Sequence, residues 1–179
     1  MAAPHCRALA LLAALSLSAC RPASRVPTVR SATAEMRTTS GQRYGVLTLE
    51  RSAAGVRIDG ALTGVPPGTH GIHFHQVGQC DPPDFATAGP HLNPTGAEHG
   101  LENPRGRHAG DLPNVTANAA GQMIVDISTP RVTLDSDPRV GLFDTDGTAL
   151  VIHANADDQR TDPAGNSGAR IACGVVRPG

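Results

Sequence analysis

The stretch Arg43–Leu62, R-Y-G-V-L-T-L-E-R-S-A-A-G-V-R-I-D-G-A-L, is the clearest guide to the fold of this 179-residue chain. Apolar and polar residues alternate on both sides of the turn-forming segment Ser52–Gly55, which is the pattern of a half-buried β-strand. The stretch therefore predicts a β-hairpin whose two strands are Arg43–Arg51 and Val56–Leu62.

Short apolar segments separated by turns continue along the rest of the chain, and no convincing amphipathic helix is present. The composition agrees, with 20 glycines and 15 prolines but only one tyrosine, three phenylalanines and no tryptophan. The other segments predicted as strands are His70–Val77, Met123–Ile127, Arg131–Leu134, Leu142–Phe143, Ala149–Ala154 and Ile171–Val176. An all-β sandwich or barrel is expected.

Two long connections, from His75 to Asp111 and from His153 to Arg170, are rich in Gly, Pro, Asn and Asp. Connections of this length in a small domain usually carry function. The chain is about one domain long, and its net charge of −1 argues against a nucleic-acid partner. Lysine is absent, so arginine must supply any positive charge that guides a substrate.

The first residues have the features of an export signal, since a positive start precedes the apolar run Ala8–Leu17, which is too short to span a bilayer. The run ends in Leu17-Ser18-Ala19-Cys20, which resembles the bacterial lipoprotein cleavage box. We expect a signal peptide over residues 1–19, a lipid-anchored tether over 20–31 that starts at Cys20, and a domain over 32–179. An ordinary secretory signal is the alternative. Either indicates a bacterial cell-envelope protein facing the periplasm or the exterior.

Once a signal peptide with Cys6 is removed and Cys20 is acylated, Cys80 and Cys173 are the remaining cysteines. In a compartment that permits disulfides their natural state is one intramolecular bond. It would stabilise the fold by roughly 2–4 kcal/mol on the loop-entropy model. Two separate buried thiols are the alternative.

Seven of the eight histidines fall between His70 and His153. After His70, their spacing runs from H-x-H through H-x7-H-x8-H-x-x-D to a last distant histidine. The residues of this pattern are the histidines His73, His75, His91, His99, His108 and His153, together with Asp111. On a strand, the two histidines of H-x-H point to the same side. Imidazole binds both zinc and copper, and one ring can serve two metals. The count therefore favours two metal ions.

Four segments of the chain form a recognisable set: His70–His75 (H-G-I-H-F-H), Ala88–Pro94 (A-G-P-H-L-N-P), His108–Leu112 (H-A-G-D-L) and Gly168–Gly174 (G-A-R-I-A-C-G). Taken together they closely resemble the copper,zinc superoxide dismutase family, and the likeness extends over about residues 32–177. The resemblance implies an eight-stranded antiparallel Greek-key β-barrel, a relative of the β-sandwiches, with two long functional loops.

The resemblance also implies the ligands. Copper would be held by His73, His75, His91 and His153, and zinc by His91, His99, His108 and Asp111, so that His91 bridges the two ions. The implied activity converts two superoxide anions and two protons to O2 and H2O2 by alternating Cu(II) and Cu(I). Zinc would be the structural and electrostatic partner.

Further roles follow from the same resemblance. Arg170 and His91 would be catalytic, with Arg170 attracting and orienting the superoxide anion. Asp157 would accept hydrogen bonds from His73 and His99, while His70 would be structural. The loop lacks the steering charges of the animal enzymes, and Arg160 is a possible substitute. Asp158 is expected to be a solvated charge.

Two alternatives remain at this stage. A non-enzymatic envelope copper-binding or copper-delivery domain of the same fold would lack some of the copper ligands or Arg170. None of these residues is missing. A zinc hydrolase built on His99, His108 and Asp111 would need an open zinc position and a general base. The sequence leaves open whether the protein is a monomer or a homodimer.

Overall fold

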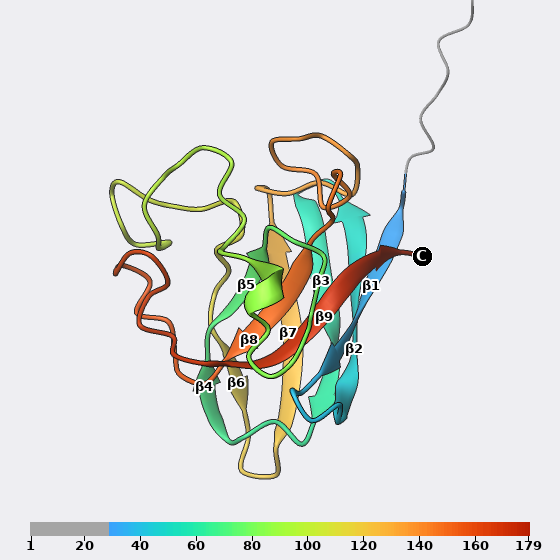
Figure 1. Ribbon diagram of the computed structural model, residues 1–179, viewed down its shortest axis with the longest axis vertical. Coiled ribbons are helices and arrows are strands. Elements are labelled where there is room, and N and C mark those ends of the chain that lie inside the picture. Colours follow the sequence, from blue (N-terminus) through green and yellow to red (C-terminus); the bar gives the residue numbers. More distant parts are fainter. Residues whose placement is uncertain (1–28) are drawn as a thin grey trace, which may run out of the picture.

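The computed structural model describes residues 29–179, which form a β-barrel of nine strands (Figure 1). The strands are β1 (Ser31–Arg37), β2 (Arg43–Ser52), β3 (Gly55–Thr63), β4 (Gly68–His70), β5 (Ile72–His75), β6 (Val115–Ala117), β7 (Gln122–Thr129), β8 (Ala149–His153) and β9 (Arg170–Pro178). A single 3-10 turn, η1 (Ala86–Ala88), lies in the loop after β5. The expected signal peptide and the tether up to residue 28 lie outside the described residues.

All pairings between these strands are antiparallel, in the order β4-β6-β7-β3-β2-β1-β9-β8-β5. The strands at the two ends of this order, β4 and β5, follow each other in the chain and are separated only by Gly71. The sheet therefore curls back on itself as a nearly closed barrel, which confirms the predicted fold class. The strand expected over His70–Val77 is interrupted at Gly71, which accounts for nine strands where eight were expected.

The predicted hairpin is formed by β2 and β3, which pair from Ser52 with Gly55 to Gly45 with Leu62. Gly55 has a φ of +107°, and a Cβ there would lie 2.2 Å from the carbonyl oxygen of Thr129, so only glycine fits this turn. Alternate side chains of the hairpin, among them Leu47, Leu49 and Ile58, are fully buried in the barrel core.

Two strand predictions are wrong. Arg131–Leu134 and Leu142–Phe143 lie in the long connection between β7 and β8, where the single bridge Thr133–Gly141 replaces a strand pairing. The side chain of Asp135 accepts hydrogen bonds from the Thr133 hydroxyl at 2.7 Å and from the Asp137 backbone at 3.0 Å. Asp side chains that bind nearby backbone favour turns over strands. The apolar residues of these segments still enter the core, but from a loop.

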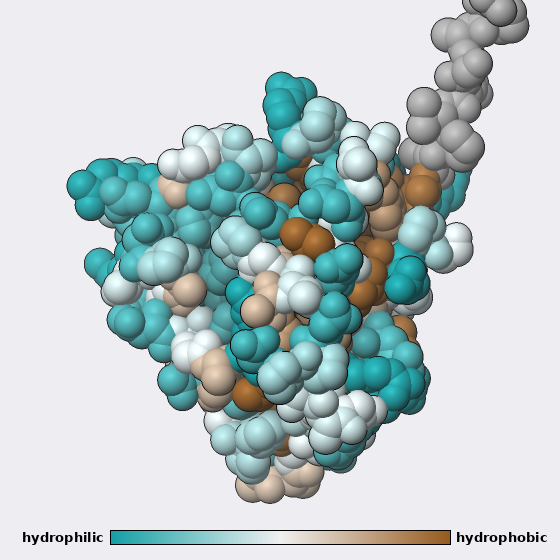
Figure 2. Space-filling view, viewed as in Figure 1, coloured by the Kyte–Doolittle hydropathy of each residue, from teal (hydrophilic) through white to brown (hydrophobic). Residues whose placement is uncertain are grey.

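The N-terminal strand β1 begins at Ser31, inside the segment expected to be a tether, and pairs with both β2 and β9. The face of the molecule shown in Figure 2 is mainly hydrophilic, with apolar patches between the polar residues. Ile124 is the one large apolar side chain among residues 29–179 that is strongly exposed. No helix in that range is long and apolar enough to cross a membrane.

Candidate metal centre

Three histidines project from neighbouring strands toward one point beside the barrel. His73 and His75 lie on β5, and His153 lies at the end of β8, which pairs with β5. Each ring is buried and fixed through one nitrogen. His75 Nδ1 donates to the carbonyl oxygen of Gly89 at 2.8 Å, and His153 Nδ1 to that of Gly168 at 3.1 Å. The Nε2 atoms of these two rings face each other at 3.4 Å.

A second group lies in the long loop between β5 and β6. The Oδ1 atom of Asp111 lies 3.1 Å from His91 Nδ1, 3.0 Å from His99 Nδ1 and 3.2 Å from His108 Nδ1. The other oxygen of Asp111 accepts backbone hydrogen bonds from Gly100 at 2.8 Å and from His108 at 2.9 Å. All four side chains are buried.

His91 belongs to both groups. Its Nδ1 faces Asp111, while its Nε2 faces the strand-borne histidines and is buried without a hydrogen-bond partner among the described residues. His73 Nδ1 is buried and unpartnered in the same way. The ligand atoms of each set lie within 4.8 Å of one another. Buried nitrogens are normally hydrogen-bonded, so this donor set fits two metal ions that share one imidazole.

His99 and the strand-borne histidines differ in proton affinity. Burial lowers the pKa of His73 to about 3 and that of His153 to about 4, so both rings are neutral at pH 7. Burial also opposes protonation of His99, but hydrogen bonds with Asp111 and Asp157 outweigh it and raise the pKa of His99 to about 9. Neutral imidazole is the form that binds a metal, so the strand-borne rings are ready for one, whereas His99 must release a proton.

Asp157 connects the two groups. Its carboxylate accepts hydrogen bonds from His73 Nε2 at 2.7 Å and from His99 Nε2 at 3.0 Å. These bonds outweigh the effect of burial and hold the pKa of Asp157 below its usual value. Because Asp157 holds both rings by Nε2, the Nδ1 atom of each ring is directed toward its group of candidate metal ligands.

Asn114 positions Asp157, and no sequence pattern singled it out. Its side-chain oxygen accepts a hydrogen bond from the backbone N–H of Asp157 at 2.8 Å, and its amide donates to the Asp157 carbonyl at 2.8 Å. One side chain thus satisfies both backbone groups of Asp157. Asn114 follows Asp111 by three residues, just before β6.

The two long loops are joined by further contacts. Asp162 accepts a hydrogen bond from the His99 backbone at 2.7 Å, and Arg160 pairs with Glu102 at 2.6 Å. The guanidinium of Arg160 is therefore engaged in an ion pair, which weakens the case for a steering role. Asp158 is more than a solvated charge, because it accepts backbone hydrogen bonds from Arg160 at 2.9 Å and Thr161 at 2.8 Å.

Arg170, at the start of β9, is half-buried beside the strand-borne histidines. Its guanidinium donates to the carbonyl oxygens of Phe85 at 2.5 Å and Gly89 at 2.7 Å. Gly89 also receives the hydrogen bond of His75, so one loop backbone orients both side chains. Phe85 is buried with a φ of +57°, and the sequence did not single it out.

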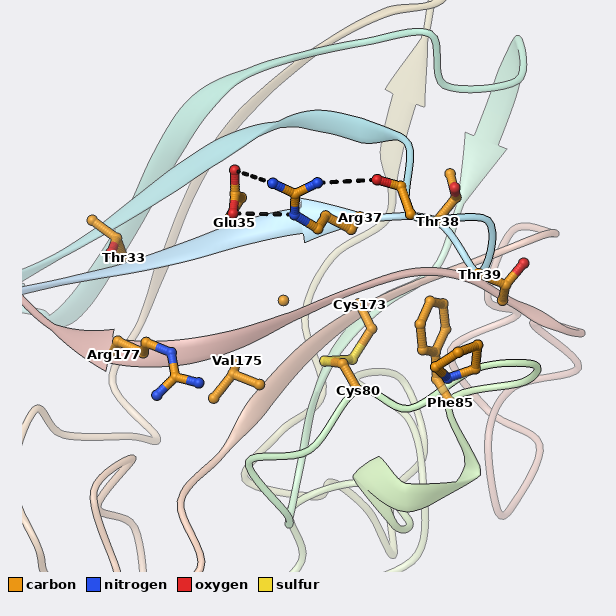
Figure 3. A pocket seen from close by; sticks show the side chains of 13 residues that line it. Thr33, Glu35, Arg37, Thr38, Thr39, Cys80, Phe85, Cys173, Val175 and Arg177 are labelled. Atoms are coloured by element: carbon orange, nitrogen blue, oxygen red, sulfur yellow. Dashed lines mark hydrogen bonds and ion pairs between the residues drawn. A yellow bond between two sulfur atoms is a disulfide. The ribbon is translucent and has the colours of Figure 1, made fainter.

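A disulfide joins Cys80 in this loop to Cys173 on β9, which confirms the predicted bond (Figure 3). The Cα atoms are 5.7 Å apart, and the bond links residues 93 positions apart. It fixes the loop that supplies Phe85 and Gly89 to the strand that carries Arg170. The disulfide lies in the wall of a pocket of about 510 Å³.

His70 lies apart from both groups. Its Nδ1 faces the carbonyl oxygen of His153 at 2.7 Å, and its Nε2 faces that of Pro66 at 2.8 Å. Both ring nitrogens are occupied by backbone, which agrees with a structural role.

Comparison with known proteins gives a consistent result. The family model for copper/zinc superoxide dismutase matches residues 43–176. A copper-zinc superoxide dismutase of Aquifex aeolicus is 46% identical over 138 residues, which are 76% of this chain and 82% of that protein. The one from Caulobacter vibrioides is 42% identical over 171 residues, covering 94% of this chain and 98% of the relative.

Solved structures extend this similarity to the fold. A superoxide dismutase-like protein from Bacillus subtilis matches with a TM-score of 0.76 and 39% identity, covering 79% of this chain and 95% of that one. The copper/zinc superoxide dismutase from Brucella abortus matches with a TM-score of 0.67 and 28% identity, covering 82% and 99%.

Proposed function

This chain belongs to the copper/zinc superoxide dismutase family and is an oxidoreductase with copper and zinc as cofactors, and from that membership we propose how its own residues divide the work. Copper would be held by His73, His75, His91 and His153. Zinc would be held by His91, His99, His108 and Asp111. The observation that carries this assignment is His91, whose two nitrogens face different donor groups.

Bound copper would supply the redox chemistry of the reaction, because it is stable as both Cu(II) and Cu(I). The balanced reaction takes two superoxide anions and two protons to O2 and H2O2. His91 takes up one of these protons at Nε2 and delivers it to the second superoxide. Its Nδ1 stays with the loop-borne group, which keeps the ring in place.

Arg170 acts on the substrate. A guanidinium has several N–H donors in a planar array, and two of its donor atoms are held by the carbonyl oxygens of Phe85 and Gly89. The group is thus fixed in one orientation before the anion arrives, and a positioned donor of this kind loses little free energy to reorganisation. Burial lowers the pKa of Arg170 without removing its charge at neutral pH.

The test combines metal analysis with the rate of superoxide decay for the wild type and for His91→Ala. The wild type should bind one copper and one zinc and accelerate the decay, and His91→Ala should lose most of the acceleration. An EPR spectrum of the Cu(II) form should change in His91→Ala. A fully metal-loaded wild type that does not accelerate decay would contradict the mechanism, and would be the behaviour of a copper-binding domain without catalysis.

The location of the protein is a separate proposal. We infer from Leu17–Cys20 that Cys20 is lipid-modified after residues 1–19 are removed, and that the domain faces the periplasm or the cell exterior. Mass spectrometry of the mature N-terminus should find a diacylglyceryl-modified Cys20, and Cys20→Ser should release the protein from the membrane fraction. An unmodified N-terminus at another residue would favour an ordinary secretory signal.

A further inference from the structure

Two arginines line a pocket of about 400 Å³ on the side of the zinc-ligand loop that faces the β7–β8 connection. Arg107 immediately precedes His108 in that loop, and Arg131 follows β7. The rest of the lining is neutral and consists of Pro94, Thr95, Ala109, Pro130 and Val140. The pocket therefore carries two positive charges and no negative one.

Five of the twelve arginines among residues 29–179 form no ion pair, namely Arg30, Arg107, Arg131, Arg170 and Arg177. Seven arginines form ion pairs with carboxylates, namely Arg37, Arg43, Arg51, Arg57, Arg105, Arg139 and Arg160. Neither Arg107 nor Arg131 has an ion pair or a side-chain hydrogen bond within residues 29–179. Each of four other surface pockets includes at least one acidic side chain.

The positive charges of Arg107 and Arg131 repel each other. Arg131 is partly buried, and burial followed by the charge of Arg107 lowers its pKa. Asp111 acts in the opposite direction, but its carboxylate is buried and already engaged by three histidines and two backbone N–H groups. The protein thus keeps two like charges together in a pocket whose lining holds no acidic side chain, and a bound anion would relieve this repulsion.

We propose that the pocket between Arg107 and Arg131 is a binding site for a small oxyanion of the phosphate class. Guanidinium groups bind phosphate oxygens through paired, charge-assisted hydrogen bonds, and Thr95 also lines the pocket. A bound oxyanion would join the zinc-ligand loop at Arg107 to the β7–β8 connection at Arg131. This site is separate from Arg170 and goes beyond the proposed dismutase function.

The test is thermal unfolding of the metal-loaded protein during a titration with inorganic phosphate, with ionic strength held constant by sodium chloride. A ligand that binds only the folded state raises the unfolding midpoint in a saturable manner. Phosphate affinity should fall about tenfold in Arg131→Gln and in Arg107→Gln, as expected for losing charge-assisted hydrogen bonds. Arg177→Gln is the matched control, because Arg177 is unpaired but lines another pocket.

Arg170 is a second candidate for phosphate, so the titration is repeated in Arg170→Gln. The response should persist there and still depend on Arg131. A response that is lost in Arg170→Gln and kept in Arg131→Gln, or no saturable response at all, would overturn the proposal. These results do not depend on superoxide decay, so they are independent of the dismutase mechanism.

A second arm identifies the source of the oxyanion. Vesicles of phosphatidylglycerol and of phosphatidylcholine are floated with the mature domain. If the protein binds phosphatidylglycerol vesicles and this binding requires Arg131, the ligand is a lipid headgroup. If the protein binds inorganic phosphate but neither kind of vesicle, the ligand is a free ion. Binding of neither would contradict the site.

Discussion

The two sides of the centre, which we propose to bind copper and zinc and call the copper side and the zinc side, are built in different ways. His73, His75 and His153 project from two paired strands, so the pleat of the barrel sets their directions. His99, His108 and Asp111 come from a loop without regular structure, and side-chain hydrogen bonds hold them in place. The copper side should therefore keep its shape as long as the barrel is folded, whereas the zinc side depends on individual contacts between loops.

The strongest test of this difference is the pH dependence of the metal-free protein. The pKa values of His73 and His153 are lower in the fold, about 3 and 4, than in an unfolded chain, about 6.5. The unfolded state thus binds more protons in this range, and stability should fall steeply as the pH drops from about 6.5 to 3. For His99 the sign is opposite. Its pKa is raised to about 9, so its contribution is complete below pH 6.5 and is lost as the pH rises through 9.

Urea unfolding of the metal-free protein between pH 3 and 10 measures both limbs. His153→Gln should reduce the acid limb alone, and His99→Gln the alkaline limb alone. Equal effects of both variants on one limb would show that the two sides do not titrate separately.

The disulfide provides the next largest effect, because it fastens the loop after β5 to β9. Replacing Cys80 and Cys173 together with serine should lower the free energy of unfolding by roughly 2–4 kcal/mol, since the crosslink closes a long loop in the unfolded chain. Urea unfolding of the wild type and of the double serine variant, both metal-loaded, measures this difference in the free energy of unfolding. A loss below about 1 kcal/mol would mean that the other loop contacts fix this segment without the bond.

Asp157 contacts the strand-borne His73 and the loop-borne His99. Asp157→Asn keeps its shape but removes the charge, and zinc affinity should fall about 10–100-fold, as is typical when the partner of a metal-binding histidine is lost. Competition with a chelator gives the affinity, and Asp126→Asn on the outside of β7 is the control. If the zinc side were held by its loop alone, both variants would bind zinc equally well.

Asn114 should have a smaller effect of the same kind. Asn114→Ala removes two hydrogen bonds to the backbone of Asp157, and zinc affinity should fall about 5–10-fold. Asn114→Asp keeps the acceptor but not the donor and should restore part of the affinity. An unchanged affinity in Asn114→Ala would show that Asp157 is positioned by the histidines alone.

The contrast between the strand-borne side and the loop-borne side also explains which features the sequence could predict. The H-x-H pair on β5, the hairpin and the disulfide all follow from local patterns or from counting. Other contacts join loops that are distant in the sequence, and no local periodicity predicts them. They are the contacts made by Asn114, by Phe85 and by the Arg160–Glu102 pair. The strand prediction for Arg131–Leu134 is wrong because alternating apolar residues can also occur in a loop whose apolar side chains enter the core. Here the side chain of Asp135 accepts hydrogen bonds from Thr133 and Asp137 and so favours a turn.

The smallest predicted effect concerns the approach of substrate on the copper side. Asp84 lines a pocket of about 420 Å³ together with Arg170, and it is the one acidic side chain in that lining. Its charge acts on Arg170 in the direction that raises the arginine's pKa, and it must repel an incoming anion. A unit charge several ångströms away in water contributes about 0.5 kcal/mol. Asp84→Asn should therefore raise kcat/KM for superoxide about twofold at low ionic strength.

The variant isolates charge from structure, because asparagine keeps the acceptor for the Ala86 backbone N–H, which lies 2.9 Å from the carboxylate. Asp81→Asn, in the same loop but outside the pocket lining, is the matched control and should change kcat/KM less. The gain should shrink as salt is added, since the Debye length falls to about 3 Å at 1 M. A gain that persists at high salt would point to a rearranged loop, and no gain at low salt would show that Asp84 does not affect substrate capture.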